Sequence, residues 1–207
     1  MRVHFSRLMQ ARQNRYSCAM DSSPLTPLLT RRSVSVKELT LPAPNAEQLA
    51  QILRVATRVP DHGKLTPWRI RILRGEGALK LGEIAAAEFG RQYPNDATEA
   101  HLAAERQRFA RAPLCLAVLS TPVLGTKPVW EQELSAGAVC MNILHAAHAL
   151  GFGAKWLTEW VAYDAEIVKA LGGKADDKIA GFVYIGSKVA EPEDRERPNL
   201  EDIVSTM

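Results

Sequence analysis

The chain has 207 residues, of which 46% are hydrophobic and 24% charged, a balance typical of a soluble globular protein with one compact domain. No apolar run approaches the roughly 20 residues of a membrane span, so we expect no transmembrane helix and no membrane partner. The three cysteines (Cys18, Cys115 and Cys140) form no CxxC pair, and the five histidines show no HxxxH or HExxH spacing. We therefore expect neither a disulfide framework nor a metal site, and a reducing compartment, the cytoplasm.

The net charge of +3 does not indicate a nucleic-acid partner. Residues 1–19 carry four arginines and no acidic residue, so removing these four from +3 leaves the rest of the chain at −1. A nucleic-acid-binding protein keeps its basic stripe on the folded domain. The same residues lack the apolar core of a secretory signal and only weakly resemble an organelle transit peptide. Residues 1–19 are therefore either a leader without fixed structure or the result of a start codon placed too early, and we favour the early start codon. We assign the domain to residues 20–207.

The first third of the chain predicts two helices, a polar loop and a strand. Residues 25–30 form a short predicted helix. Asn45 is a suitable helix cap with Gln48 three residues later, the pattern of a capping box, and apolar residues then follow at helical spacing. Residues 60–67 lie between two prolines and predict a loop, and residues 68–73 predict a strand.

The middle of the chain predicts helices around a buried strand. Residues 78–111 are rich in helix formers and are interrupted near Tyr93-Pro94-Asn95. Residues 114–119 form an uninterrupted apolar run, as expected for a central strand buried on both faces. A long helix is predicted over residues 129–150, with Gly151 as its C-cap.

The last third predicts a strand over residues 154–157, a helix from Asp164 to Leu171, and a final apolar strand over residues 179–185. Beyond it we expect an extended, polar tail. Helices and strands alternate without repeats, which indicates a single α/β or α+β domain.

Two features favour a homodimer. The 129–150 helix is apolar over more than one face, as helices buried on several sides are. The tail contains Leu200, Ile203 and Val204 but has no core of its own to join. Packing of this helix against a second copy would cover both.

Three clusters carry candidate chemistry. Arg31-Arg32-Ser33 offers two guanidinium groups and a hydroxyl to a phosphate, although paired arginines are more often solvated surface charge. The loop around Arg58, His62 and Lys64 offers donors to a flavin ring; alternatively, Asp61 pairs with Arg58 and Trp68 is simply core. Residues 151–158 have glycines that let a backbone approach a ligand, or that serve only as a cap and a turn.

Taken in order, these motifs resemble the nitroreductase family. The order is RRS, R-x-P-D-H-x-x-x-x-P-W, WEQELSAGAVCMNIL, GFGxxW and a GF-x-Y-x-G strand. The resemblance covers residues 20–207, and the sequence is most similar to the short bacterial branch of the family. Residues 1–19 have no counterpart in the family's pattern. It implies a mixed central sheet flanked by helices, in an intimate dimer with two FMN sites at its interface.

The resemblance also implies which residues contact the cofactors. One set matches FMN-binding positions. The tripeptide and the tail arginine match contacts to the phosphate, the loop matches contacts to the ring, and the tryptophan segment matches residues that run along the ring from the partner chain. The set is Arg31, Arg32, Ser33, Arg58, His62, Lys64, Trp156, Leu157, Thr158 and Arg197. A second set matches the segment that meets the nicotinamide nucleotide: Ala146, Ala147, His148, Ala149, Leu150 and Gly151.

The function that follows is hydride transfer from NADH or NADPH through FMN to a small acceptor such as a nitroaromatic or a quinone. The flavin supplies the reactivity, so no catalytic side chain is expected. Two alternatives stay open: a specialised flavin reductase or dehalogenase acting on one metabolite, and a protein that binds FMN without turnover.

Overall fold

The computed structural model describes residues 23–207, so the expected leader at residues 1–19 lies outside the described residues. The described residues divide into two compact units, one formed by residues 32–195 and the other, called the terminal unit here, by residues 23–31 and 196–207.

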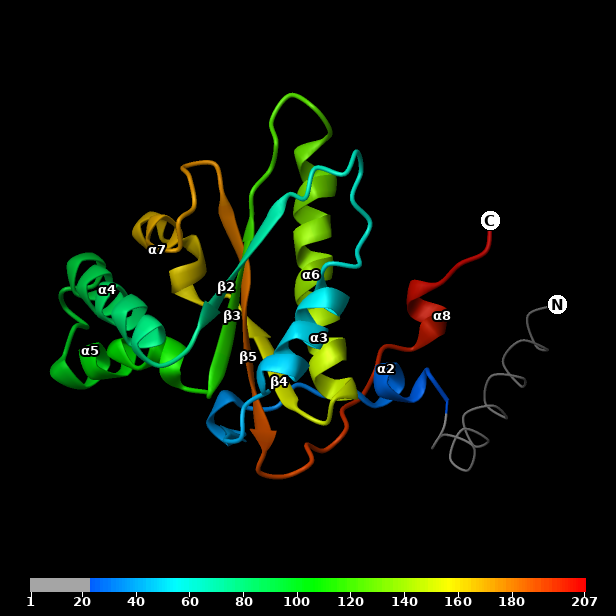
Figure 1. Ribbon diagram of the computed structural model, residues 1–207, viewed down its shortest axis with the longest axis horizontal. Coiled ribbons are helices and arrows are strands. Elements are labelled where there is room, and N and C mark those ends of the chain that lie inside the picture. The colour runs from blue at the N-terminus through cyan, green and yellow to red at the C-terminus, as the bar shows by residue number, and fades with distance from the viewer. Residues whose placement is uncertain (1–22) are drawn as a thin grey trace. The chain divides into compact units, whose positions relative to one another are not determined.

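A five-stranded sheet is the centre of the 32–195 unit (Figure 1). Its order is β1-β5-β3-β2, and β4 pairs with β5. The expected class, a sheet flanked by helices, is confirmed, with one correction: every pairing among residues 23–207 is antiparallel rather than mixed. The strands are β1 (Leu39–Thr40), β2 (Trp68–Leu73), β3 (Leu114–Ser120), β4 (Gly153–Leu157) and β5 (Lys178–Lys188).

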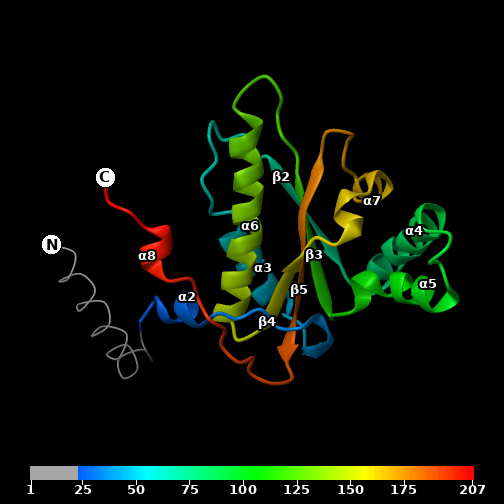
Figure 2. The ribbon, with the colours of Figure 1, turned by 180° about the vertical axis from the view of Figure 1, so that it is seen from behind.

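The central strand β3 is buried on both faces, as its apolar run predicts, because strand side chains alternate between faces. Leu116 and Val118 pack beneath α3 (Ala46–Ala56) and α6 (Val129–Ala149). Cys115 and Ala117 pack on the opposite face, under α4 (Glu76–Gln92) and α7 (Ala165–Ala170). Both helical layers are visible from behind in Figure 2.

The helix termini follow the predicted chemistry. At the start of α3, the Asn45 side chain accepts a hydrogen bond from the Gln48 amide at 2.9 Å, and the Gln48 side chain accepts one from the Asn45 amide at 3.0 Å. This confirms the capping box. The 78–111 region forms α4, α5 (Glu99–Arg106) and the 3-10 helix η2 (Arg108–Ala110). The break between α4 and α5 falls at Tyr93–Thr98, where it was predicted.

Several short elements were not predicted, because two to four residues carry no detectable periodicity. They are η1 (Val36–Glu38), β1 and η3 (Trp160–Tyr163). In the terminal unit, the tail expected to be extended contains the short helix α8 (Leu200–Ile203), with Asn199 as its cap. That unit also contains α2 (Thr26–Thr30). Neither α2 nor α8 buries a residue, and their apolar side chains are exposed.

Candidate functional site

The last two residues of β4 and the residue after it are half-buried and are together called the β4 platform here: Trp156, Leu157 and Thr158. Because strand side chains alternate between faces, Trp156 packs on the α3/α6 face of the sheet and Leu157 on the opposite face. Strand β5 has a bulge at Ala180, because Val118 pairs with Gly181 while Leu119 pairs with Ile179. The Ala180 carbonyl accepts a hydrogen bond from Trp156 Nε1 at 3.0 Å. The Ala180 carbonyl thus fixes the indole, and the Trp156 side chain is half-buried.

Gly181 is required for this arrangement. A Cβ at this position would lie 3.0 Å from Trp156 Cε2 and closer still to Nε1 and Cδ1. Any larger residue would therefore displace the indole. This contact explains why a glycine begins the GF-x-Y-x-G strand.

Part of the predicted phosphate-binding tripeptide lies beside the start of β4. The Val34 amide donates to the Ala154 carbonyl at 3.2 Å. Arg32 uses its Nε for the Glu193 carbonyl at 2.9 Å and for Asp194 Oδ1 at 3.5 Å. Among residues 23–207 these are its polar contacts, so both terminal nitrogens can bind a further anion. Ser33 is exposed next to it.

Strand β4 runs from the predicted phosphate-binding tripeptide toward the β4 platform. Ala154 and Thr158 are four residues apart, about 13 Å in an extended strand. Arg31 and Arg197, the other two predicted phosphate ligands, belong to the terminal unit, where Arg31 is half-buried and Arg197 is exposed.

The predicted flavin-binding loop, residues 58–66, is tied to α6 by side chains that the sequence reasoning had not assigned. Asn142 Nδ2 donates to the carbonyls of Val55 at 3.2 Å and Arg58 at 3.0 Å. Ser135 Oγ donates to the Pro60 carbonyl at 2.5 Å. These bonds fix the loop backbone and leave its cationic side chains to point outward.

His62 is oriented by Glu131, at the first turn of α6. The His62 Nδ1 and Glu131 Oε2 atoms are 2.6 Å apart, and both side chains are about half exposed. With Nδ1 directed at a carboxylate, Nε2 faces away and is the ring atom left for a ligand. Glu131 was missed because its only sequence signal is its place in the WEQEL motif.

Asp61 shapes the 58–66 loop by accepting backbone hydrogen bonds. Its two carboxylate oxygens accept from the amides of Leu65 at 3.0 Å and Thr66 at 2.9 Å. The alternative in which Asp61 pairs with Arg58 is therefore wrong, and Arg58 is exposed without an ion pair among the described residues. The same alternative is right about Trp68, which is a core residue with 6% exposure.

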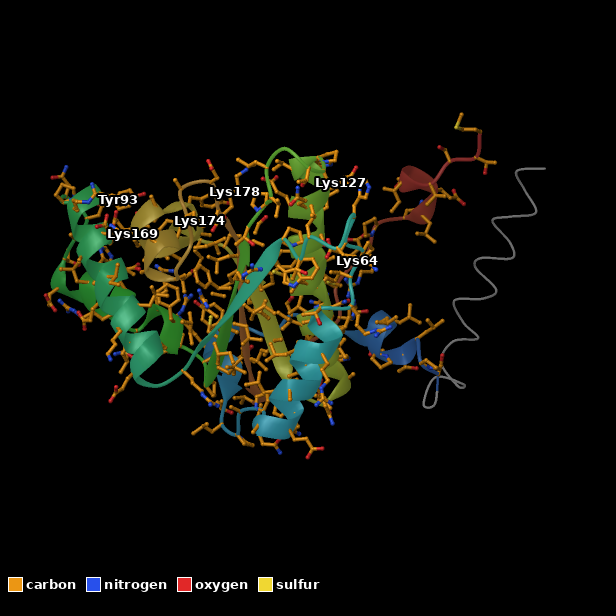
Figure 3. The ribbon with its side chains drawn as sticks, turned by 45° about the horizontal axis from the view of Figure 1, so that its top comes forward. Lys64, Tyr93, Lys127, Lys169, Lys174 and Lys178 are labelled. Atoms are coloured by element: carbon orange, nitrogen blue, oxygen red, sulfur yellow. The ribbon has the colours of Figure 1, made fainter. Side chains whose placement is uncertain are left out.

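Two lysines flank the tip of this loop. Lys127, in the segment before α6, crosses Gly63, where a Cβ would lie 3.2 Å from Lys127 Cε. Lys64 is the next residue along the loop and is exposed. Figure 3 shows Lys64 and Lys127 at the same end of α6. Lys127 adds a cation that the sequence motif did not indicate.

The 58–66 loop and the β4 platform lie on different sides of α6 within one chain. Helical residues are about 100° apart, so Glu131, Ser135 and Asn142 point within about 40° of one another. Gly137 points at least about 120° away from each of them, and a Cβ there would meet the Trp156 ring at 3.9 Å. One chain alone therefore keeps the two predicted flavin-binding segments apart.

Backbone strain is concentrated beside these two segments. Among residues 23–207, three non-glycine residues have positive φ: Lys64 at 56°, Thr66 at 50° and Glu159 at 56°. The first two are in the 58–66 loop, and the third directly follows the β4 platform. Such conformations persist only where the surroundings enforce them, and they gather at functional sites.

Glu159 has an unusual backbone conformation. Its ψ of −179° completes a conformation that is almost confined to glycine. Its carboxylate contacts Arg111 Nη2 at 2.6 Å and Arg108 Nη1 at 3.0 Å. Burial alone would raise the pKa of Glu159, but the hydrogen bond from Arg111 and the charge of Arg108 outweigh it and lower the pKa below its ordinary value of 4.5.

The segment expected to meet the nicotinamide nucleotide forms the end of α6. The amides of Leu150, Gly151 and Phe152 close the helix onto preceding carbonyls, and Gly151 has a φ of 85°. Ala146 and Ala147 are buried at 7% and 0% exposure. A ligand can therefore reach the exposed residues of this segment but not those two side chains.

Within the described part of the chain, no group of three or more His, Cys, Asp or Glu side chains is arranged to hold a metal ion. No helix there is long and apolar enough to cross a bilayer.

Comparison with known proteins identifies relatives of this sequence. The model of the family described as "Nitroreductase family" matches residues 28–187. A protein of Escherichia coli (strain K12) named "Putative NAD(P)H nitroreductase YdjA" is 38% identical over 169 residues, which cover 77% of this chain and 85% of that protein.

Solved structures share the fold. The "Nitroreductase-like Family Protein from Bacillus cereus" superposes with a TM-score of 0.78 at 22% identity, over 92% of this chain and 99% of that one. A Desulfovibrio desulfuricans protein, solved "in complex with fmn", gives a TM-score of 0.68 at 23% identity, over 90% of this chain and 98% of that one. At these identities the superpositions establish the fold alone.

Proposed function

The chain belongs to the nitroreductase family, and from this premise we propose that it is an FMN-dependent oxidoreductase that uses NADH or NADPH to reduce small planar acceptors such as nitroaromatics and quinones. The observation that carries the proposal is the placement of strain. All three positive-φ non-glycine residues among residues 23–207 adjoin the two segments that the family resemblance assigns to the flavin ring. Such conformations gather at sites that bind a ligand, which supports a ligand at these two segments.

The residues present fit FMN. Arg32 has terminal nitrogens to offer a phosphate, with Ser33 exposed beside it. Trp156 offers a half-buried aromatic ring to a flat ligand. The 58–66 loop presents Arg58, His62 and Lys64 outward. Arg31 and Arg197 belong to the terminal unit, and their contact with the phosphate stays a prediction of the family resemblance.

FMN, when bound, supplies hydride acceptance and donation. The side chains of this chain bind and tune it. Arg58, and the Nε2 of His62 when both ring nitrogens carry a proton, would place positive charge and hydrogen-bond donors at the pyrimidine edge, where negative charge accumulates on reduction. Glu131 keeps the His62 ring in one orientation, and Trp156 would exclude water from one face of the flavin ring. No nucleophile or general acid is required of the protein.

We propose that the working form is a homodimer. The β4 platform of one chain needs a 58–66 loop, and its own lies on the far side of α6. On α6, Trp130 and Leu134 are one turn apart and 67% and 53% exposed, an apolar stripe that a second copy would cover. Light scattering should report twice the 22.8 kDa chain mass. A double Trp130→Ser/Leu134→Ser variant should shift toward monomer and lose FMN, and a wild-type monomer that binds FMN would refute the dimer.

We propose that the nicotinamide nucleotide binds at the end of α6, where Ala149 and Gly151 are exposed.

We also propose that the protein acts in the cytoplasm, where the free thiols of Cys115 and Cys140 would stay reduced.

The decisive experiment is anaerobic titration of the purified, FMN-loaded protein with NADH and with NADPH. Bleaching of the flavin absorbance, followed by reoxidation on adding a nitroaromatic or a quinone, is the expected result. A flavin that binds but is not bleached would indicate a non-catalytic FMN-binding protein. Turnover with only one narrow class of acceptor would indicate a specialised reductase instead. Arg58→Ala and His62→Ala should weaken FMN binding and lower its midpoint potential while the apoprotein melts as before.

A further inference from the structure

We infer that Glu159 is a positioning residue of the flavin site: its ion pairs with Arg108 and Arg111 hold the backbone after β4 in a glycine-type conformation, and this conformation sets the direction of Thr158, the last residue of the β4 platform and the one that is not paired with β5. The inference rests on the proposed function, because the direction of Thr158 matters only if the platform meets the flavin. It goes further in naming a residue that no motif of the family resemblance includes.

Residue 159 is the joint between two anchored elements. Strand β4 is paired with β5 up to Leu157, which lies opposite Phe182. The helix η3 begins at Trp160, and its Val161 and Ala162 are buried at 0% and 5% exposure. Only two residues connect these fixed ends. The φ and ψ of Glu159 therefore determine the path of the peptide that ends the platform.

The arginines that hold Glu159 are themselves fixed. Arg111 Nε donates to the Arg108 carbonyl at 2.8 Å, and Arg111 Nη2 donates to the Tyr184 hydroxyl at 3.1 Å. Tyr184 is fully buried in the core. Arg108 also pairs with Glu105, whose residue exposure is 5%. A carboxylate held by partners this rigid can keep its own backbone strained.

A glutamate and a glycine adopt the backbone conformation at position 159 for different reasons. Glycine reaches the observed conformation without strain but also reaches many others. Alanine has the same strain as glutamate and no carboxylate to resist it, so an alanine at 159 should relax to an ordinary conformation. Glu159→Ala and Glu159→Gly thus remove the same ion pairs but differ in whether the backbone can keep its shape.

The experiment measures FMN dissociation constants by fluorescence quenching for the wild type, Glu159→Ala and Glu159→Gly, together with apoprotein melting temperatures. We expect Glu159→Ala to bind FMN at least about tenfold more weakly than the wild type. The reason is that, without the ion pairs, FMN binding must supply the energy that returns the relaxed backbone to its strained conformation. Glu159→Gly should recover most of that loss. Glu99→Gln is the matched control, because it removes a glutamate ion pair, that with Arg106 at 2.6 Å, without touching Glu159, Arg108 or Arg111, and it should leave the FMN constant unchanged.

Equal FMN constants in all three proteins would overturn the inference, and so would equal weakening in the alanine and glycine variants, since only the ion pairs would then matter. Amide hydrogen exchange of residues 153–160 in the apoproteins provides a readout that does not need the flavin. Faster exchange in Glu159→Ala than in Glu159→Gly is expected, and the same rate in both contradicts the positioning role. A wild type that fails to bind FMN would instead refute the proposed function, while the exchange comparison still tests the backbone.

Discussion

Replacing Gly181 with alanine tests whether the close approach of Trp156 to β5 organises the β4 platform. The new Cβ would lie 3.0 Å from Trp156 Cε2 and closer to two other indole atoms. Overpacking of this kind costs about 1–3 kcal/mol, and the displaced indole would also lose its hydrogen bond to the Ala180 carbonyl, worth about 1 kcal/mol. We therefore expect a loss of about 2–4 kcal/mol in the free energy of unfolding, with weaker FMN binding.

Urea denaturation of the apoprotein measures this loss, and a thermal melt should show a fall of about 4–16 °C for a chain of this size. Gly137→Ala is a matched control, because its Cβ would meet the same Trp156 ring at an ordinary 3.9 Å. In the middle of α6 that alanine should stabilise the helix by up to about 1 kcal/mol. If Gly181→Ala and Gly137→Ala had the same effect on stability, the reasoning from the indole contact would be refuted.

Three further predictions follow from the contacts of single side chains. Asn142→Ala removes two hydrogen bonds to the carbonyls at the start of the 58–66 loop and should cost about 1–2 kcal/mol in urea denaturation; no loss would mean that α6 does not hold the loop. Because the pKa of Glu159 is lowered, the stabilisation from its charged form is present above pH 4.5 and is lost as pH falls through the lower folded-state pKa. Glu159→Gln should therefore be less stable than the wild type at pH 7, and its free energy of unfolding should fall less on acidification below pH 4.5. Burial raises the pKa of Cys140 to about 12 and raises that of Cys115, so a Cys18→Ser variant should react with a thiol reagent only after unfolding, and rapid reaction of the native protein would contradict the burial.

Local sequence patterns were enough to predict most of the fold. The Asn45 capping box depends on residues three apart, and the apolar run of β3 directly reports burial on both faces. The motifs of the family resemblance also named Arg58 and His62, which the structure places outward on one loop.

The rest depends on contacts between residues far apart in the chain. At the bulge, the Ala180 carbonyl accepts a hydrogen bond from Trp156, which lies 24 positions earlier. The backbone of Glu159 is set by Arg108 and Arg111, about 50 positions before it. No window of neighbouring residues contains this information. The role of Glu131 toward His62 is likewise visible only when α6 and the loop are placed side by side.

The long helix α6 has a consequence for how two sites in one dimer would communicate. It bonds the 58–66 loop on one side and faces the β4 platform on another. In the proposed dimer these two segments contact different flavins, so α6 of each chain would link the two flavin sites. Occupation of one flavin site should then change the affinity of the other, and by thermodynamic linkage the effect must be mutual. We therefore expect an FMN titration of the apo-dimer to deviate from the binding curve of two identical, independent sites.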